Sequence, residues 1–209
     1  MAQASSVKNL IFDLGGVILD LSVDHTLQSF SDLSGLEKKK VKELFISAPG
    51  FLEYEKGLID DEEFRSFVRK LYNVTADDAA LDASWNAMLR GIPQQKLDLL
   101  LSLKNKFNVY LLSNTNTIHL NYIHDKILLP HFQEKSLDRY FHKTYYSHLM
   151  KKRKPDADIF EQVLEENRLA PQETLFLDDN ADNIAGAKAL GIQTVHVVTP
   201  DVIMDYFND

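Results

Sequence analysis

The sequence contains no cysteine among its 209 residues. Disulfides, thiolate nucleophiles and cysteine-ligated zinc sites are therefore excluded. No uninterrupted apolar run approaches the ~18 residues that a membrane-spanning helix needs. The polar segment Met1–Val7 lacks the apolar stretch of a secretory signal. These absences lead to the expectation of a soluble, cytoplasmic protein that has no membrane partner.

Positive charge is also scarce, because 23 Lys and Arg are set against 31 Asp and Glu, which gives a net charge of −8. This acidic balance disfavours a general nucleic-acid-binding protein. The seven histidines show no spacing typical of a metal site, and no feature predicts an oligomeric state. Apolar residues, in contrast, make up 44% of the chain, which is enough for a hydrophobic core in one domain, or in one domain with an insertion.

The stretch around which the chain is organised is Lys8–Leu21, with the sequence KNLIFDLGGVILDL. Leu10–Phe12 predict a buried strand, Asp13 follows at once, and Gly15 and Gly16 then interrupt regular structure. A buried charge is costly unless it is paired. At the carboxyl end of a parallel strand, facing a crevice, such a carboxylate fits a functional group. A chance aspartate in a turn is the alternative.

The region that follows is predicted to be helical. Apolar residues recur at helical spacing from His25 to Leu89, without a clear strand. Asp60, with Glu63 three residues later, predicts a capped helix start. Because strands flank the region on both sides, residues 22–91 are predicted to form an all-helical cap inserted into an α/β domain. The segment that begins at Gly91 is the expected return hinge.

Strands and helices alternate in the rest of the chain. The predicted strands are Val109–Leu112, Thr144–Ser147, Thr174–Leu177 and Thr194–Val198. The predicted helices are Leu97–Lys106, His119–Leu129, Ile159–Asn167 and Ala185–Leu190. This alternation predicts a Rossmann-like parallel sheet flanked by helices, formed by residues 1–21 and 92–209.

Polar side chains follow several predicted strands at the point where each strand ends, and a lysine precedes one helix. These residues are Asp13, Ser113, Asn114, Lys154, Asp178 and Asp179. The carboxyl ends of parallel strands share one crevice, so we expect these groups to converge. Carboxylate oxygens hold a hard cation such as Mg²⁺, and the cation, a lysine and a hydroxyl together hold a phosphate. Asp13 is then placed to attack phosphorus as a nucleophile.

Four sequence strings that carry these residues resemble the motifs of the haloacid dehalogenase superfamily, in the branch with a helical cap after the first motif. The strings are IFDLGGVILD, LLSNTN, KKRKPDADIF and LFLDDNADNIAGA, joined in the predicted cap by YEKGLIDDEEF. Within the superfamily, the chain is similar to α-glucose-1-phosphate phosphatase-like members. The resemblance runs from about Asn9 to Phe207.

The resemblance implies a role for each residue that matches a catalytic or phosphate-binding position. Asp13 matches the nucleophile that becomes a phospho-aspartate. Lys154 matches the lysine that orients the nucleophile and the phosphate. Ser113 matches the phosphate-binding hydroxyl, with the backbone of Asn114 beside it. The implied substrate is a small phosphorylated molecule.

The resemblance also implies a magnesium site. Asp13, Asp179 and the backbone carbonyl of Gly15 match the direct ligands. Asp178 lies beside them and matches a position that orients Lys154 in some relatives. Asn183 takes the place of an aspartate that many relatives use for a water-mediated contact with the metal.

Gly15 departs from the wider family, which has an aspartate there as general acid and base. Candidates to replace it are Asp20, Asp24, His25 and Glu55. A sugar's anomeric oxygen is a good leaving group, so the missing acid favours sugar 1-phosphates within a Mg²⁺-dependent phosphatase of sugar phosphates. A 2-haloacid dehalogenase-type hydrolase that acts at carbon, and a non-catalytic binding or regulatory protein, remain alternatives.

Several of these residues also have a simpler interpretation. Ser113 is a plausible helix N-cap. Lys151–Arg153 belong to a basic run and are predicted to be exposed, in contrast to Lys154. In the predicted cap, Glu53, Glu55 and Lys56 are ordinary surface residues in this interpretation, and a substrate contact by Glu55 or Lys56 is the alternative.

Overall fold

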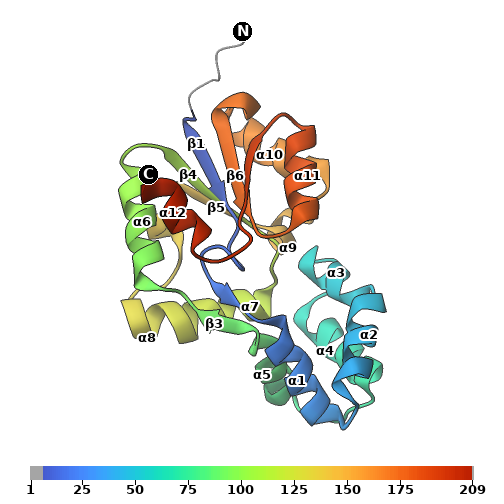
Figure 1. The fold of residues 1–209 in the computed structure, drawn as a ribbon. Coiled ribbons are helices and arrows are strands. Elements are labelled where there is room, and N and C mark those ends of the chain that lie inside the picture. The colour runs from blue at the N-terminus through green and yellow to red at the C-terminus, as the bar shows by residue number, and fades with distance from the viewer. Residues whose placement is uncertain (1–6, 209) are drawn as a thin grey trace.

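A computed structural model describes residues 7–208 and contains a five-stranded parallel sheet (Figure 1). The strands are β1 (Asn9–Phe12), β4 (Asn108–Ser113), β5 (Lys143–Tyr146), β6 (Thr174–Asp178) and β7 (Gln193–His196). Their order is β5-β4-β1-β6-β7, with every neighbouring pair parallel. The predicted Rossmann-like sheet is confirmed. The prediction for Met1–Val7 falls outside the described residues, except for Val7.

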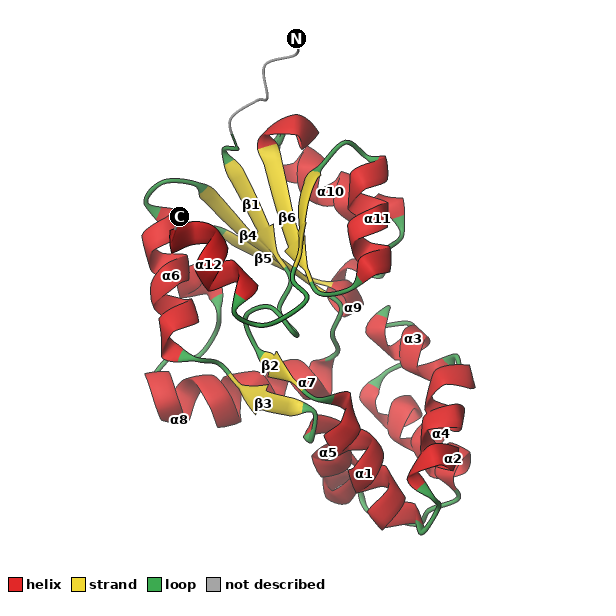
Figure 2. Ribbon diagram, in the orientation of Figure 1, coloured by secondary structure: helices red, strands yellow, loops and turns green. Residues whose placement is uncertain are grey.

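Helices cover both faces of the sheet (Figure 2). On one face lie α6 (Gln94–Lys104) and α12 (Val202–Asn208), and on the other α10 (Ala157–Asn167) and α11 (Ala181–Ala189). The short helices α7 (Thr117–Tyr122), α8 (Leu129–Phe132) and α9 (Ser147–Met150) lie towards the carboxyl ends of the strands. Successive side chains of a strand point to opposite faces. Ile11 accordingly packs in the cluster of α10 and α11, while Leu10 and Phe12 pack in the cluster that includes α6. Because both faces are covered, β1 is a continuous apolar run.

A second group of helices lies beyond the carboxyl ends of the strands (Figure 1). These helices are α1 (Val23–Ser34), α2 (Lys38–Ser47), α3 (Gly50–Glu55), α4 (Asp61–Tyr72) and α5 (Asp78–Asn86). Their core surrounds Trp85, whose ring centroid lies 5.3 Å from that of Phe64 and 5.4 Å from that of Phe51. The predicted start of α4 is confirmed, since Asp60 and Glu63 form a capping box. This group is the helical cap.

A short antiparallel pair of strands, β2 (Asp20–Leu21) and β3 (Leu89–Gly91), joins the cap to the sheet (Figure 2). The sequence did not predict these strands, because two or three residues are too few to show a period. Gly91 has φ +133°, a backbone conformation that favours glycine. It ends β3 where the chain returns from the cap.

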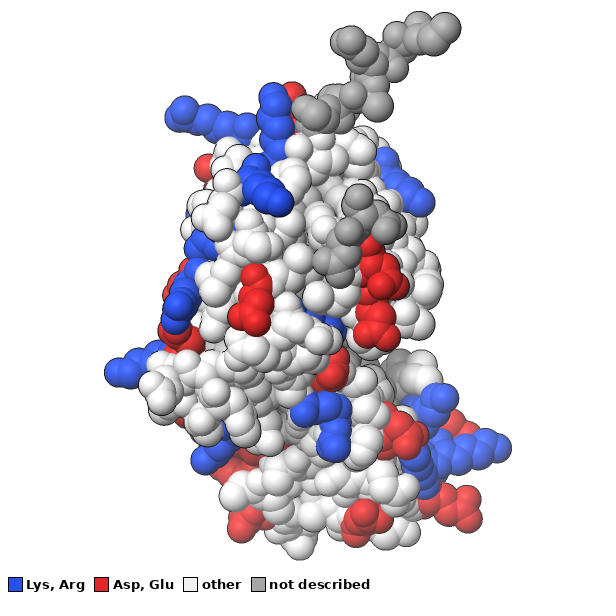
Figure 3. Space-filling view, turned by 60° about the vertical axis from the view of Figure 1, so that its left-hand side comes forward, with Lys and Arg blue, Asp and Glu red and all other residues white. Residues whose placement is uncertain are grey.

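Other helical segments differ from the predictions in detail. The predicted helix His119–Leu129 begins earlier, as α7, and continues through a π-helical turn, η1 (Ile123–Leu128), into α8. The short 3₁₀ turns are η2 (Asp138–Tyr140) and η3 (Pro171–Glu173), and neither they nor α9 and α12 were predicted. None of the helices between residues 7 and 208 combines the length and apolar character that crossing a bilayer requires. On the face shown in Figure 3, charges of both signs are interspersed with broad uncharged areas.

Candidate active site

Three carboxylates meet at the carboxyl edge of the central strands. Asp13 follows β1, and its N–H donates to the Leu177 carbonyl of β6 at 2.9 Å. Asp178 ends β6, and Asp179 follows it. One carboxylate oxygen from each of the three aspartates lies within 4.8 Å of those of the other two. The expected convergence of the two strand ends is therefore present.

Lys154 is fully buried between two of these carboxylates. Its Nζ lies 2.7 Å from Asp13 Oδ1 and 2.6 Å from Asp178 Oδ2. The side chain of Asn114 holds the lysine backbone, because its amide donates to the Lys154 carbonyl and its Oδ1 accepts from the Lys154 N–H, both at 2.9 Å. The sequence had indicated only the Asn114 backbone, as a phosphate donor. The structure adds a positioning contact that spans 40 residues of chain.

The pKa values of Asp13, Asp179 and Lys154 are shifted by burial and by the charges of their neighbours. Burial raises the pKa of Asp13 to about 7, and Asp178 adds to this while Lys154 opposes it. Burial, together with the neighbouring Asp178, also raises the pKa of Asp179. For Lys154, burial disfavours the charged form, but Asp13 and Asp178 outweigh it and raise its pKa. One lysine thus faces three acids, and a cation with oxygen ligands would relieve the excess negative charge.

The two neighbouring aspartates have different surroundings. Asp178 is fully buried, and its carboxylate accepts from Lys154, from the Asn180 N–H at 2.8 Å and from the Asn183 amide at 3.0 and 3.1 Å. Asp179 is exposed, and among the described residues its carboxylate accepts only from its own backbone N–H. Asp178 is therefore suited to orient Lys154, and Asp179 is free to hold a cation.

A cavity of about 260 Å³ opens between the sheet and the cap beside this cluster. Gly15, Ser113 and Asn114 line it from the sheet, and Glu55 and Trp85 line it from the cap. Ser113 is not a helix cap, since Asn116 caps α7 by accepting from the His119 N–H at 3.0 Å. The Ser113 hydroxyl is therefore available at the cavity.

Predictions about several charged side chains are wrong. Arg153 and Glu55 were predicted to be surface residues, but both are half-buried and form an ion pair. The Arg153 Nε and Nη2 lie 3.2 and 3.0 Å from Glu55 Oε2. Lys151 is exposed as predicted, and Lys152 is half-buried. The pair joins residues 98 positions apart, which no local pattern indicates.

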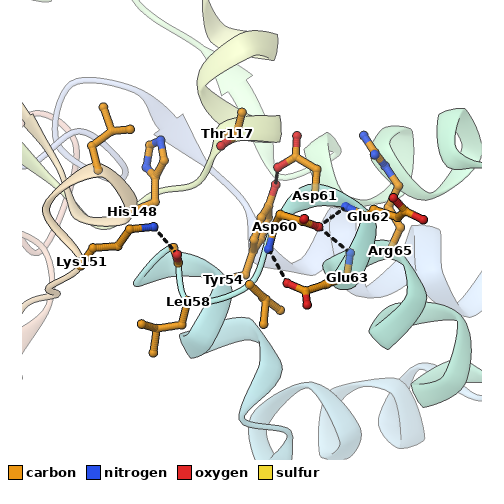
Figure 4. A pocket seen from close by; sticks show the side chains of 13 residues that line it. Tyr54, Leu58, Asp60, Asp61, Glu62, Glu63, Arg65, Thr117, His148 and Lys151 are labelled. Carbon is orange, nitrogen blue, oxygen red and sulfur yellow. Dashed lines mark hydrogen bonds between the residues drawn. The ribbon is translucent and has the colours of Figure 1, made fainter.

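A second, larger cavity of about 660 Å³ lies between the start of α4 and helix α9 (Figure 4). Three of its four acidic residues are already engaged: Asp60 and Glu63 form the capping box of α4, and Asp61 accepts from the Tyr54 hydroxyl at 2.6 Å. The three clustered aspartates line neither cavity, but the smaller one is lined by Leu14 and Gly15, which directly follow Asp13, and by Ser113 and Asn114. The smaller cavity is therefore the candidate active site.

Comparison with known proteins agrees with this geometry. A family model described as haloacid dehalogenase-like hydrolase matches residues 7–191. The chain belongs to this family of hydrolases. The resemblance seen in its sequence strings is thus confirmed, and the protein is an enzyme of the hydrolase class.

Three similar proteins of this family bear on the site. The hydrolase is 32% identical over 190 residues to a D-ribitol-5-phosphate phosphatase of Bacteroides thetaiotaomicron. The aligned residues cover 90% of each of the two chains. It is 25% identical to the sesquiterpene phosphatase astK of Aspergillus oryzae, over 93% of this chain and 92% of that protein. A crystal structure of the family enzyme bt-2542 of B. thetaiotaomicron, in complex with magnesium and inorganic phosphate, superposes with a TM-score of 0.83. The two sequences are 39% identical, and the superposition covers 91% of this chain and 94% of the bt-2542 chain.

Proposed function

We propose that this hydrolase is a Mg²⁺-dependent phosphatase of small phosphorylated metabolites that works through a phospho-aspartate at Asp13. The observation that carries the proposal is the cluster of Asp13, Asp178 and Asp179 around the buried Lys154, at the sheet edge that borders the cavity. Asp13, Asp179 and the Gly15 carbonyl supply the oxygen ligands that Mg²⁺ prefers. When bound, the ion offsets the negative charge of the phosphate and of the carboxylates.

Each residue of the site has its own role in the proposed reaction. An Asp13 carboxylate oxygen attacks phosphorus, and the bond to the leaving oxygen breaks. Lys154 reduces the repulsion between the attacking carboxylate and the anionic phosphate, while the Ser113 hydroxyl donates to a phosphate oxygen. Asp178 and Asn114 hold Lys154 in place. Water then hydrolyses the acyl phosphate and regenerates Asp13.

The helical cap, which we place at residues 22–91, covers the cavity and excludes water from it. Among the contacts that dock it on the sheet domain are three near the end of α3. The Ser147 hydroxyl donates to the Glu55 carbonyl at 2.6 Å, and Lys56 pairs with Asp156 at 2.9 Å. The third contact is the Glu55–Arg153 pair. A cap docked in this way encloses a substrate of metabolite size.

Removal of divalent metal is expected to abolish turnover, because the carboxylates and the phosphate would then repel each other. Enzyme treated with EDTA should lose p-nitrophenyl phosphate hydrolysis and regain it with Mg²⁺. Mg²⁺ should also raise the melting temperature of the enzyme without substrate, since it relieves repulsion between the buried acids. Full activity in EDTA would favour the alternative chemistry at carbon.

Gly16 is expected to be irreplaceable, because a Cβ there would lie 2.4 Å from Asp179 Oδ2. Its φ of +75° adds about 1 kcal/mol of backbone strain for any other residue. Gly35→Ala is a matched control, since Gly35 has φ +71° and nothing within 4 Å of its Cβ position. Both variants should have a slightly lower melting temperature than wild type, but only Gly16→Ala should lose Mg²⁺-dependent activity. Equal activity of the two would show that Asp179 is dispensable.

Sugar phosphates, and sugar 1-phosphates in particular, are the proposed substrates. The anomeric oxygen is a better leaving group than a primary alkoxide because the ring oxygen withdraws electron density. We therefore expect a higher kcat/KM for glucose 1-phosphate than for glucose 6-phosphate at saturating Mg²⁺. Faster hydrolysis of the 6-phosphate would contradict this and favour a terminal ester, as in the name of the D-ribitol-5-phosphate phosphatase relative.

The lining of the cavity favours a second candidate substrate class, monophosphates with a hydrocarbon group. Most lining residues are apolar: Leu14, Leu19, Leu21, Val23, Phe45, Trp85, Met88, Leu89 and Ile123. Such a surface stabilises an apolar ligand by roughly 25 cal/mol per Å² of ligand surface that it removes from water. A prenyl monophosphate tested beside glucose 1-phosphate decides between the two classes by kcat/KM.

A further inference from the structure

Cleavage of a phosphate ester expels an alkoxide, and a general acid that protonates it contributes roughly 10² to 10⁴ in rate. Gly15 has no side chain with which to do this. If the proposed phosphatase function holds, the proton for a poor leaving group must come from another residue. That residue has to reach the cavity in which the organic part of the substrate lies.

The cavity lining offers few candidates. Glu55 and His119 are its only ionisable side chains among the described residues. The His119 ring lies with Nε2 3.1 Å from the Trp85 carbonyl, to which it donates, and Nδ1 accepts from the Asn116 amide at 3.2 Å. Burial also lowers the pKa of His119 to about 4, so the ring is neutral and has no free proton to give. Glu55 remains.

The other candidates from the sequence are engaged away from the cavity. Asp20 pairs with Lys96 at 3.2 Å, and Asp24 pairs with Lys38 on the surface. The ring of His25 is hydrogen-bonded to Ser22. None of the three lines the cavity.

Glu55 is held in a way that leaves one carboxyl oxygen unused. Arg153 contacts only Oε2, and no partner of Oε1 is found in the part of the chain that the structure describes. The next residue after Arg153 is Lys154, so the Glu55 carboxyl is tied to the catalytic cluster through one peptide link. Burial raises the pKa of Glu55, although Arg153 and Lys154 oppose this, so the carboxyl holds its proton more strongly than an exposed glutamate does.

We propose that Glu55, on the cap, is the general acid and base of this hydrolase, in place of the side chain that Gly15 lacks. In the first step the Asp13–phosphorus bond forms, the ester bond breaks, and its electron pair goes to the leaving oxygen, which takes the Glu55 proton. In the second step water attacks phosphorus, the bond between Asp13 and phosphorus breaks with its electron pair returning to the carboxylate, and Glu55 accepts the proton that water releases. Asp13, phosphate and protonated Glu55 are restored.

Because Glu55 belongs to the cap, the acid lies at the cavity only while the cap is docked. Its position depends on the same contacts that close the cap, namely those with Arg153 and Ser147. Proton donation is thereby coupled to enclosure of the substrate. A substrate that prevents docking would be cleaved only if its leaving group needs no proton.

The test compares two esters of similar shape, p-nitrophenyl phosphate and phenyl phosphate, in wild type and Glu55→Gln. Phenoxide is the poorer leaving group and depends more on a proton donor. Glu55→Gln should lower kcat for phenyl phosphate by roughly 10²-fold, and for p-nitrophenyl phosphate only a few-fold, with little change in KM. The preference for glucose 1-phosphate over glucose 6-phosphate should widen as well, since the weaker leaving group gains more from protonation.

Two control variants separate this role from a structural one. Glu53→Gln removes an exposed carboxylate from the same helix and should change kcat for neither ester. Arg153→Gln removes a partner on which the position of Glu55 depends, so it should lower kcat for phenyl phosphate more than for p-nitrophenyl phosphate, but by a smaller factor than Glu55→Gln does. An equal fall for both esters in Glu55→Gln, or a rise in KM alone, would overturn the proposal.

The same assay keeps this proposal apart from the proposed function. If wild-type enzyme with Mg²⁺ hydrolyses neither ester, the phosphatase function fails. If it hydrolyses both and Glu55→Gln leaves their ratio unchanged, only the role of Glu55 fails.

Discussion

Asp13→Asn is expected to abolish ester hydrolysis, with a loss on the order of 10⁴-fold or more in kcat, while the fold is retained. An amide oxygen does not form the acyl phosphate, and no other carboxylate of the cluster can take over. Asp178 is saturated with hydrogen bonds, and Asp179 follows a different strand. Asp13 is 8% exposed at a strand end, and its backbone bond to Leu177 is unaffected by the substitution.

The stability of Asp13→Asn provides an internal control. In the metal-free protein, the pKa of Asp13 is raised to about 7 from its ordinary 3.8. Between those values the folded state binds more protons than the unfolded chain, so this group makes stability fall as pH rises from about 4 to 7. Asn removes that dependence. The metal-free variant should therefore be at least as stable as wild type at pH 8, as measured by thermal unfolding.

Turnover of p-nitrophenyl phosphate with saturating Mg²⁺ measures the activity. Substantial residual turnover by purified, folded Asp13→Asn would show that another group attacks phosphorus. A variant that fails to fold would instead show that Asp13 is needed for the sheet edge itself. A thermal unfolding transition shows whether the purified variant is folded, and so distinguishes residual turnover by a folded enzyme from failure to fold.

The fold was predictable because its strands are buried on both faces. Leu10–Phe12 form a run that is fully buried, and such a run differs clearly from the periodic apolar residues of the cap helices. The strands β2 and β3 were missed because they are held by each other rather than by an apolar period. They form only when the cap brings Leu21 and Leu89 together.

The aspartates and Lys154 of the site were predictable because each occupies the end of a strand or a position before a helix. Topology alone brings such positions to one edge. The Glu55–Arg153 pair and the Asn114–Lys154 contacts were not predictable in this way. They depend on how the cap docks and on where a loop crosses the sheet, and both arise only from tertiary packing. A local charge pattern therefore placed Arg153 wrongly at the surface.

Lys154→Met is expected to cost both activity and stability. The substitution leaves Asp13 and Asp178 without their shared cation at 2.7 and 2.6 Å. Removal of one partner from a buried ion pair destabilises a protein by about 3–5 kcal/mol, because the remaining charge stays uncompensated. Turnover should fall by roughly 10³-fold, since a positive group that meets the phosphate is lost from a water-excluded site.

Lys96→Met is the matched control for the loss of a buried lysine. Lys96 is 2% exposed and pairs with Asp20, but the Asp20 side chain is 44% exposed and can be hydrated when the lysine is removed. This variant should lose less stability than Lys154→Met and keep phosphatase activity. Equal losses would mean that the damage comes from replacing any buried lysine rather than from the acid cluster.

The pH dependence of the Lys154→Met defect tests its cause. Lys154 opposes the raised pKa of Asp13, so its removal raises that pKa further. At pH 5 the folded variant then holds a protonated Asp13, and little unpaired charge remains. At pH 8 the carboxylates must ionise beside each other or keep a proton at a cost. Without metal, the difference in unfolding free energy between wild type and Lys154→Met should therefore grow from pH 5 to pH 8. A difference that is constant over this range would show that Lys154 stabilises the fold by packing and not by its charge.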